Sequence, residues 1–401
     1  MEFINLKKQY ELIRPTLTVK LDDIMTQAHF IGGPEVGEFE GRLAGYVGRK
    51  YCHGCGNGTE ALQLAYMAYG IGEGDAVFCP AMTFIASVEP AAMLGATPVF
   101  CDIEPDTYNL SPESLREQIE RVEREGALRP RAVVSVDFLG NPARFDEISE
   151  ICREHGLLLI EDAAQGTGAS YKGRRCGSFG DIACTSFFPS KPLGCYGDGG
   201  AVFTDSDEVS ELISSLKVHG KGSSKYDNVR IGMNSRLDTV QAAVLLAKLD
   251  LLDDEMEKRQ QVAARYWDAF EGKIQTPKIT EESVSSFAQF VLIAESQEQR
   301  DAVVAAMKAA GVRNRCRVRD IPPGIEYLTA IPRMKRYMQV SGEIVGSYFE
   351  LVSPQDLQVY SIDECFIDAA PYLRLYRIDA RTFAKRLMRR AFEVSDGTAT
   401  A

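Results

Sequence analysis

A lysine and a pair of acids lie about thirty positions apart near the middle of the chain. Glu161 and Asp162 end the apolar run Leu157–Ile160, and Lys191 follows in a stretch of Ser, Pro and Gly residues. A lysine amine can bind an aldehyde as a Schiff base, and a carboxylate can keep a pyridine nitrogen protonated. Pyridoxal phosphate (PLP) needs both groups, because its protonated ring accepts the electrons of the reaction. The spacing therefore favours PLP chemistry at these residues.

A second stretch, GNGTEALQLAYMAYG at Gly56–Gly70, could bind the phosphate of such a cofactor. Small residues lead into a helical pattern of apolar positions, so the free N–H groups and the positive dipole end of a helix would face an anion. The alternative is an ordinary glycine turn in which Thr59 caps the helix. This motif on its own does not decide between the two.

The segments around these residues alternate between strand and helix patterns, which predicts a mostly parallel sheet covered on both faces. Ligands of such sheets bind beyond the carboxyl ends of the strands, and Asp162 comes at such an end. We expect strands at 76–78, 97–102, 132–136, 157–160, 182–187, 200–204 and 287–293, and helices at 35–47, 56–70, 111–125, 144–155, 206–219, 237–266 and 297–310. The pattern at 237–266 fits one long helix or a broken pair.

The composition is typical of a soluble globular protein with room for two or three structural units: 401 residues, 45% hydrophobic and 25% charged. The net charge of −12 argues against a nucleic-acid binder overall. The charge is uneven, because residues 313–401 hold 14 Lys and Arg against 11 Asp and Glu, which leaves −15 for the first 312 residues. The chain therefore changes character near position 312.

Ten cysteines are scattered without a paired framework, which favours a reducing compartment and a cytoplasmic protein. The N-terminus lacks the apolar core of a signal peptide, and no apolar run reaches membrane-spanning length. Cys52 and Cys55 form a CxxC pair without a second ligand pair at a suitable spacing, so we expect two small buried strand residues rather than a zinc or redox site. We expect no metal.

Six ordered motifs occupy the larger, N-terminal part of the chain: GNGTEAL, PAMTFIAS, LGATPVFCDI, IEDAAQGTGA, SFFPSKPLGCYGDGGA and GMNSRLDTVQAA. With them, residues 1–312 resemble the DegT/StrS-type, PLP-dependent nucleotide-sugar aminotransferases. The resemblance implies a fold-type-I PLP transferase, an α/β fold whose mostly parallel sheet is sandwiched by helices. It also implies a PLP-binding large domain at 1–250 and the start of a small C-terminal domain at 251–312.

The resemblance assigns roles at the ring end of the cofactor. Lys191 would bind PLP covalently and then move a proton as base and acid. Asp162 would pair with the pyridinium nitrogen, Gln165 would contact the ring hydroxyl, and Phe84 would stack on the ring face. In the alternative, Lys191 is a solvated loop lysine, Asp162 a strand-end cap and Phe84 a core aromatic. Dehydrating relatives carry a histidine at the position of Lys191, so the lysine favours transamination.

At the phosphate end, the resemblance implies contacts from Gly58, Thr59 and Ser186. Asn234 would reach the phosphate of the neighbouring subunit's cofactor, which implies a homodimer with shared active sites. The alternative for Asn234 is a turn residue.

SFFPSKPLGCYGDGGA together with KYDNVRIGMNSRLDT resembles the branch that aminates UDP-linked 3-oxo-hexuronic acids for surface polysaccharides such as lipopolysaccharide, with glutamate as the amino donor. A sugar acid needs a cation for its carboxylate. The branch keeps its sugar-binding groups in a segment that here holds Lys221, Lys225, Tyr226, Arg230 and Arg236. A solvated basic loop is the alternative. The expected partners are a nucleotide sugar and glutamate, and neither a membrane nor a nucleic acid.

From about Arg313 the sequence resembles a fragment of a Y-family translesion DNA polymerase, through YSIDECFID at 360–368. In that family the adjacent acids lie on a strand and help to hold magnesium. The first metal-binding aspartate motif is missing, so we favour an acidic pair without a metal at Asp363 and Glu364. The chain is thus predicted to be composite, with an atypical α+β segment at 313–401. The alternatives are a PLP-binding protein without turnover, because the small domain is replaced, and a polymerase-related fragment.

Overall fold

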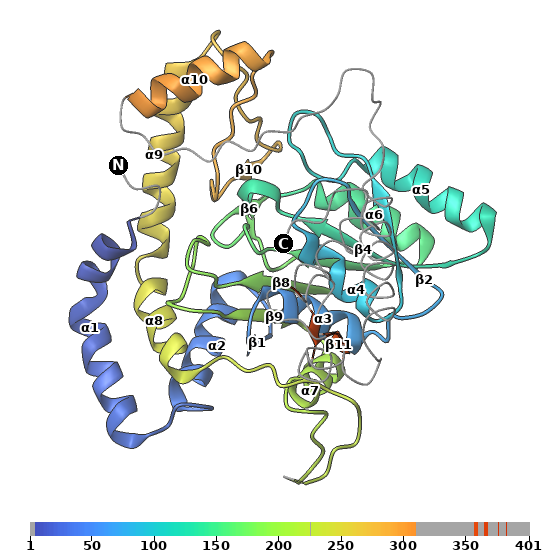
Figure 1. The fold of residues 1–401 in the computed structure, drawn as a ribbon, viewed down its shortest axis with the longest axis vertical. Coiled ribbons are helices and arrows are strands. Elements are labelled where there is room, and N and C mark those ends of the chain that lie inside the picture. Colours follow the sequence, from blue (N-terminus) through green and yellow to red (C-terminus); the bar gives the residue numbers. More distant parts are fainter. Residues whose placement is uncertain are drawn as a thin grey trace. The chain divides into compact units, whose positions relative to one another are not determined.

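The computed structural model describes residues 5–224, 226–309, 357–359 and 365–367, together with residues 376 and 382 (Figure 1). The chain forms two compact units, Met1–Pro322 and Pro323–Ala401. In the second unit, β11 (Leu357–Val359) and β12 (Cys365–Ile367) pair antiparallel. Asp363 and Glu364, the acids of the polymerase-like motif, lie outside the described residues.

Helices and strands alternate along the first unit, as the sequence pattern predicts. The strands are β1 (Tyr51–Cys55), β2 (Asp75–Pro80), β3 (Thr97–Cys101), β4 (Arg129–Val136), β5 (Leu158–Asp162), β6 (Ser170–Tyr171), β7 (Arg174–Arg175), β8 (Ile182–Ser186), β9 (Gly200–Thr204) and β10 (Ser283–Val284). The helices are α1 (Leu6–Gln27), α2 (Pro34–Val47), α3 (Gly58–Ala68), α4 (Glu89–Met93), α5 (Pro112–Glu125), α6 (Phe145–His155), α7 (Asp207–Leu216), α8 (Thr239–Leu249), α9 (Leu252–Phe270) and α10 (Gln297–Ala309), with short 3-10 helices η1 (Ile85–Ser87) and η2 (Phe138–Gly140).

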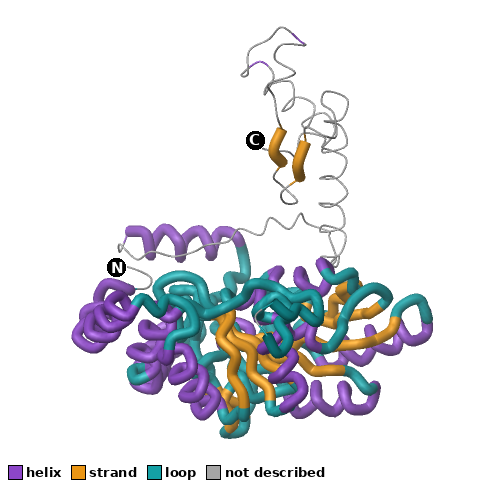
Figure 2. The backbone as a smooth tube through the Cα atoms, turned by 90° about the horizontal axis from the view of Figure 1, so that it is seen from below, coloured by secondary structure: helices purple, strands orange, loops and turns teal. Residues whose placement is uncertain are grey.

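One sheet of seven strands, in the order β1-β9-β8-β5-β4-β2-β3, forms the centre of this unit. The strands from β8 to β3 pair in parallel, and β9 runs antiparallel to both of its neighbours. The strands run through the middle of the unit with helices around them (Figure 2). The predicted α/β fold, with a mostly parallel sheet sandwiched by helices, is confirmed for this unit.

Neighbouring residues of one strand pack in different layers, because strand side chains alternate between the two faces of a sheet. In β9, Val202 packs in the core under α3, α4 and α7, whereas Ala201 and Phe203 pack under α2 and α8. In β4, Val134 joins the first of these cores and Val133 packs with α5 and α6. Both faces of the sheet are thus buried, which explains why the strands are apolar along most of their length.

The structure decides two of the less certain predictions from the sequence pattern. The stretch predicted as one long helix or a broken pair is a broken pair, since α8 ends at Leu249 and α9 begins at Leu252. The strand predicted at 287–293 is wrong. Phe287 has a φ of +42°, and Phe287 and Phe290 pack on Trp267 of α9 with ring centroids 5.4 and 5.6 Å away. Aromatic packing on α9 has replaced strand pairing there.

The CxxC pair, Cys52 and Cys55, is buried on β1. Burial raises the pKa of both thiols, that of Cys55 to about 12, so both stay protonated at neutral pH. The expectation of two small buried strand residues is confirmed. No helix within the described ranges is both long and apolar enough to cross a membrane.

Gly200 lies where the start of α3 packs closely on the sheet, and a substitution there can test this packing. A Cβ added at Gly200 would lie 2.5 Å from the backbone carbonyl of Asn57 and 2.8 Å from the amide nitrogen of Gly58, so Gly200→Ala must displace the helix start. We expect the change to lower the free energy of unfolding by about 1–3 kcal/mol. Gly45→Ala is the control, because its Cβ meets nothing within 4 Å. In α2 this change should stabilise by about 1 kcal/mol. Urea denaturation measures both, and equal effects would contradict the close packing.

Candidate active site

Asp162 ends β5 and is buried at the carboxyl edge of the sheet. Its carboxylate accepts two hydrogen bonds, from the Ser87 hydroxyl at 2.8 Å and from the Ala164 backbone N–H at 3.1 Å. Ser87 Oγ lies 2.7 Å from the Thr83 hydroxyl, which extends the network. These bonds fix the orientation of the carboxylate. Sequence reasoning missed Ser87 and Thr83, although both belong to the motif PAMTFIAS.

Lys191 lies half-buried in the loop between β8 and β9. Its backbone N–H donates to the Phe188 carbonyl at 2.8 Å, which folds the loop into a turn. Burial lowers the pKa of Lys191, and the negative charge of Asp162 partly offsets this effect. The amine is therefore within electrostatic range of Asp162. Its lowered pKa also means that it loses its proton more readily, and the nitrogen can attack a carbonyl only after that proton has left.

The start of α3 offers an anion-binding geometry. Asn57 caps the helix: its Oδ1 accepts from the Glu60 N–H and its Nδ2 donates to the Glu60 carboxylate, both at 2.9 Å. The alternative in which Thr59 is the cap is wrong, because Thr59 already lies inside the first turn. A Cβ at Gly58 would lie 2.7 Å from the Ser186 Cβ, so only a glycine lets β8 approach this closely. The structure thus brings Gly58, Thr59 and Ser186 to one helix N-terminus.

Gln165 lies in the loop that follows β5. Its side-chain Oε1 accepts a hydrogen bond from the Leu139 N–H at 2.9 Å, which orients the amide. Its backbone carbonyl accepts from the Ser286 hydroxyl at 2.6 Å, and the Ser286 N–H donates to the Gly140 carbonyl at 2.9 Å. Two separate segments therefore brace this loop.

Phe84 directly precedes η1, in the loop that follows β2. Its side chain is 69% exposed, so the alternative in which Phe84 is a core aromatic is wrong. Ser87, which lies in η1, donates one of the two hydrogen bonds that the Asp162 carboxylate accepts. The loop that carries Phe84 is therefore tied directly to the acid at the end of β5.

The residues expected to bind the sugar and the second subunit lie between α7 and α8. Their side chains are exposed at Lys221, Tyr226, Arg230, Asn234 and Arg236, and Lys225 lies outside the described residues. The Arg230 guanidinium donates to the hydroxyl of Ser215 in α7 at 2.6 Å, so it is already engaged with that helix. The Gly56 N–H donates to the Ser235 hydroxyl at 3.1 Å, which ties the segment of Asn234 to the start of α3.

A second buried lysine supports the loop of Lys191, and sequence reasoning missed it. Lys248 of α8 is only 4% exposed. Its amine donates to the Gly194 carbonyl at 2.5 Å and lies 4.3 Å from the centre of the Tyr196 ring. Burial lowers the pKa of Lys248 to about 8. The signal in the sequence is a lysine that directly follows the apolar run 242–247 of the same helix.

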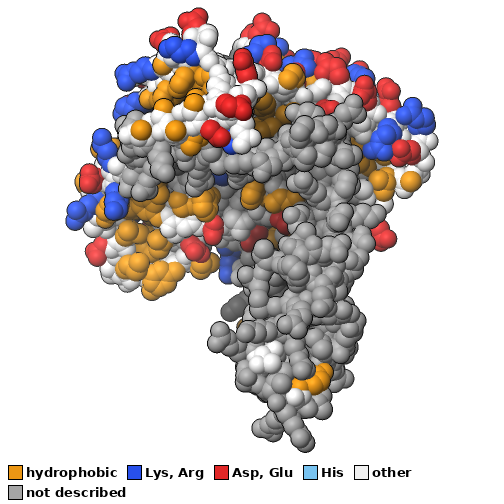
Figure 3. Space-filling view, turned by 45° about the horizontal axis from the view of Figure 1, so that its top comes forward, with side chains coloured by type: hydrophobic (Ala, Val, Ile, Leu, Met, Phe, Trp, Pro, Cys, Tyr) orange, Lys and Arg blue, Asp and Glu red, His pale blue; other side chains and the backbone are white. Residues whose placement is uncertain are grey.

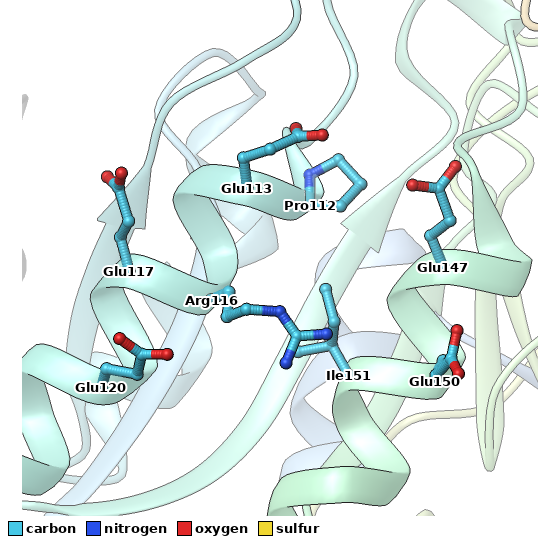
Figure 4. Close-up of a pocket in the computed structure, with 8 residues that line it drawn as sticks. All are labelled: Pro112, Glu113, Arg116, Glu117, Glu120, Glu147, Glu150 and Ile151. Atoms are coloured by element: carbon cyan, nitrogen blue, oxygen red, sulfur yellow. The ribbon is translucent and has the colours of Figure 1, made fainter.

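A groove of about 320 Å³ lies elsewhere on the first unit, between α5 and α6 (Figure 4). Five glutamates and Arg116 line it, and Arg116 is paired with Glu154 at 2.5 Å. Such a lining repels phosphate groups. None of the predicted cofactor residues takes part in it, so the groove is separate from the candidate active site.

The carboxyl edge of the sheet thus combines an oriented acid, a lysine with a lowered pKa and a helix N-terminus. A model of the DegT/DnrJ/EryC1/StrS aminotransferase family matches residues 12–323. The chain belongs to this family. It is 46% identical over 315 residues to the UDP-2-acetamido-2-deoxy-3-oxo-D-glucuronate aminotransferase of Pseudomonas aeruginosa, with 78% of this chain and 84% of that protein covered. It is 36% identical over 312 residues to the UDP-N-acetyl-3-dehydro-alpha-D-glucosamine 3-aminotransferase of Acidithiobacillus ferrooxidans, with 77% and 81% covered.

Solved structures agree with this assignment. The crystal structure of a DegT DnrJ EryC1 StrS aminotransferase from Brucella abortus has a TM-score of 0.75 and 45% identity, and the match covers 78% of this chain and 83% of that one. DesV of S. venezuelae, solved in complex with a ketimine intermediate, has a TM-score of 0.75 and 34% identity, with 83% and 90% covered. The predicted fold-type-I aminotransferase family is confirmed.

A model of the impB/mucB/samB family, which comprises Y-family polymerases, matches residues 287–401. The second predicted resemblance is therefore confirmed as well. The two matches overlap at 287–323, and the change of character predicted near 312–313 falls inside this overlap. The predicted domain boundaries stay predictions.

The charge of Asp162 provides a test of the pKa of Lys191. Because burial lowers this pKa and Asp162 raises it, Asp162→Asn should lower it further. Acetylation of the cofactor-free protein with limiting acetic anhydride, followed by mass spectrometry, reports the fraction of neutral amine at each pH. We expect the pH at which labelling of Lys191 is half-maximal to be lower than that of exposed lysines. In Asp162→Asn this midpoint should be lower still. A midpoint that rises or stays constant in the variant would contradict the proximity of the two groups.

Lys248 should make stability depend on alkaline pH. Native Lys248 releases its proton near pH 8, whereas an unfolded lysine keeps its proton to about pH 10.4, so the unfolded state binds more protons between these values. The unfolding free energy of the wild type should therefore rise, relative to Lys248→Met, by roughly 2–3 kcal/mol from pH 7 to 10. Lys248→Arg, which keeps a donor but does not titrate, should lose the same pH-dependent increment. Urea denaturation across this range measures it, and an increment that persists in either variant would contradict the assignment.

Proposed function

We propose that this chain is a PLP-dependent transaminase that moves an amino group from glutamate to the keto group of a UDP-linked 3-oxo-hexuronic acid for surface polysaccharide synthesis. One observation carries the proposal. In a chain of this family, Asp162 lies at a parallel-strand end within electrostatic range of Lys191, whose pKa burial lowers.

The described residues fit PLP. The first turn of α3 and Ser186 would hold the phosphate, because the close approach at Gly58 leaves backbone N–H groups to face an anion. Phe84 offers an exposed ring to stack on, and Gln165 an oriented amide. When bound, PLP supplies an aldehyde for a lysine amine and a ring that takes up electrons.

Two residues of the chain would do most of the chemical work. Asp162 would keep the ring nitrogen protonated, while Ser87 and the Ala164 N–H hold its carboxylate in place. The Lys191 nitrogen would bind the aldehyde and, once released, take a proton from the amino-bearing carbon of glutamate. Its lowered pKa suits this role, because a base must be neutral before it can accept a proton.

The substrate class rests on the names of relatives and on the basic loop between α7 and α8. Both curated relatives named above are aminotransferases of UDP-sugars that carry a 3-oxo or 3-dehydro group. Lys221, Tyr226, Arg230 and Arg236 would contact the sugar and its carboxylate. Lys221 and Arg236 are the better candidates for the carboxylate, since Arg230 already donates to Ser215.

A homodimer with shared active sites completes the proposal. Large apolar side chains are exposed on the loops around the site, including Phe188 at 52% and Ile231 at 87%. Hydrophobic side chains also gather at the lower left of the face drawn in Figure 3, whereas charges of both signs are interspersed along its upper edge. Exposed apolar surface of this kind favours a protein partner. A second copy would cover it and bring its Asn234 to the phosphate of the first.

The absorption spectrum of the purified chain tests the function. With PLP we expect a long-wavelength band of lysine-bound cofactor, which excess glutamate converts to the shorter-wavelength amine form. Lys191→Ala should lose this band and at least about a thousandfold in turnover, whereas Lys273→Ala, an exposed lysine, should retain both. A band that glutamate leaves unchanged would indicate cofactor binding without turnover, and the absence of a band in the wild type would refute the proposal.

A further inference from the structure

Asp137, Glu161 and Cys176 form a buried cluster that the proposed reaction does not use. Both acids are fully buried, and Cys176 is 1% exposed. Their carboxylate oxygens and the thiol sulfur lie within 4.8 Å of one another. Glu161 precedes Asp162 in β5, and side chains alternate along a strand, so Glu161 faces the opposite side of the sheet. The cluster therefore lies directly behind the acid that would face the cofactor.

The two carboxyl groups differ in their partners. One Glu161 oxygen accepts from the Gly177 N–H at 2.6 Å, and the other from the Phe179 N–H at 2.7 Å. Among the described residues, no N–H or hydroxyl group donates to either oxygen of Asp137, whose neighbours are the Glu161 carboxylate and the Cys176 thiol. N–H donors stabilise a carboxylate, whereas a buried carboxylate without donors is strongly unfavourable. The negative charge therefore belongs on Glu161 and the proton on Asp137.

The surrounding charges point to the same assignment. Burial raises the pKa of Asp137 well above its usual value, and the negative charges of Glu161 and Asp162 add to this effect. Burial also raises the pKa of Glu161, but its two N–H donors and the charge of Arg49 oppose this effect and favour the carboxylate form. The Cys176 thiol stays protonated, because burial raises its pKa more than the nearby Arg175 lowers it.

Asp137 also begins the turn that links two residues of the candidate site. Its N–H donates to the Asp162 carbonyl at 3.1 Å, and the Leu139 N–H donates to Gln165 Oε1 at 2.9 Å. A Cβ at Gly166 would lie 2.1 Å from Asp137 Oδ2, so the loop of Gln165 rests on this carboxyl group. Leu139 has a φ of +61°, a conformation that the surrounding structure must hold in place. A change in the Asp137 side chain would therefore reach both Asp162 and Gln165.

We propose that Asp137 is a positioning residue: it stays a neutral carboxylic acid, shares its proton with Glu161, and holds Asp162 and Gln165 in place through the turn that it begins. The part concerning the cofactor rests on the proposed function, whereas the shared proton is a property of the chain itself. A metal ion is the rival occupant of the cluster. Since both Glu161 oxygens already accept N–H bonds, one proton balances the cluster without an ion.

The first experiment uses the cofactor-free protein, so that it does not depend on the proposed function. The native protein would keep on Asp137 a proton that the unfolded chain releases near pH 4, so stability should fall as the pH rises. Between about pH 5 and 7, the unfolding constant of the wild type should rise relative to that of Asp137→Asn by up to tenfold per pH unit. Asparagine keeps the shape and a donor toward Glu161 but cannot titrate. Urea denaturation at a series of pH values measures the ratio.

The second experiment measures the positioning role through the dissociation constant of PLP. Asp137→Asn should retain the wild-type constant within about threefold, whereas Asp137→Ala should weaken binding by about tenfold or more, as expected when a buried partner is lost. Asp75→Asn is the control for general loss of stability, because it removes the charge of a buried acid that pairs with the exposed Arg129 at the start of β2, the end away from the candidate site. It should unfold more easily and yet bind PLP as the wild type does.

The outcomes separate the inference from the proposed function. The inference is supported if the ratio of the unfolding constants of the wild type and Asp137→Asn depends on pH and if only Asp137→Ala loses affinity for PLP. A constant ratio across the pH series would overturn the shared proton even in a fully active transaminase. About one equivalent of metal in the purified wild type that is absent from Asp137→Asn would overturn it in favour of a metal site. Equal PLP affinity in Asp137→Ala and wild type would overturn the positioning role.

Discussion

The orientation of one carboxylate, that of Asp162, is the constraint on which the carboxyl edge of the sheet depends. The loop after β2 reaches it through the Ser87 hydroxyl, and β4 reaches its backbone through the Asp137 N–H. The loop after β8 places the Lys191 amine within range of its charge. Each of these strands runs parallel to β5, so their ends meet at one edge and their loops converge on one group.

The close packing around this edge limits which residues the sequence can use. Gly58 lets Ser186 approach the start of α3, and Gly166 lets the Gln165 loop rest on Asp137. Lys248 holds the Gly194 carbonyl, which belongs to the same loop as Lys191. Gly166 and Lys248 are not among the residues expected to bind the cofactor. They limit how far Gln165 and Lys191, which are expected to bind it, can move.

Much of this arrangement could be predicted from the sequence. The strand and helix pattern gave the sheet, because buried parallel strands and amphipathic helices differ in period. The spacing of Asp162 and Lys191 indicated the edge. The network of Ser87 and the cluster around Asp137 could not be predicted, since their members are brought together by sheet order rather than by sequence distance. The strand expected at 287–293 failed because an apolar run does not distinguish strand pairing from aromatic packing on Trp267.

The hydrogen bonds of Ser286 have a consequence for how this chain could arise. Ser286 holds the Gln165 carbonyl and the Gly140 carbonyl, and the polymerase-family match begins one residue later. The two Ser286 bonds therefore lie just before the polymerase-family match, whereas the Gln289 N–H, which lies inside that match, donates to the Leu139 carbonyl at 3.3 Å. A recombination joint placed downstream of Ser286 leaves this brace intact. A joint beyond Phe290 would also keep the Gln289 bond to the turn after β4 and the packing of Phe287 and Phe290 on Trp267.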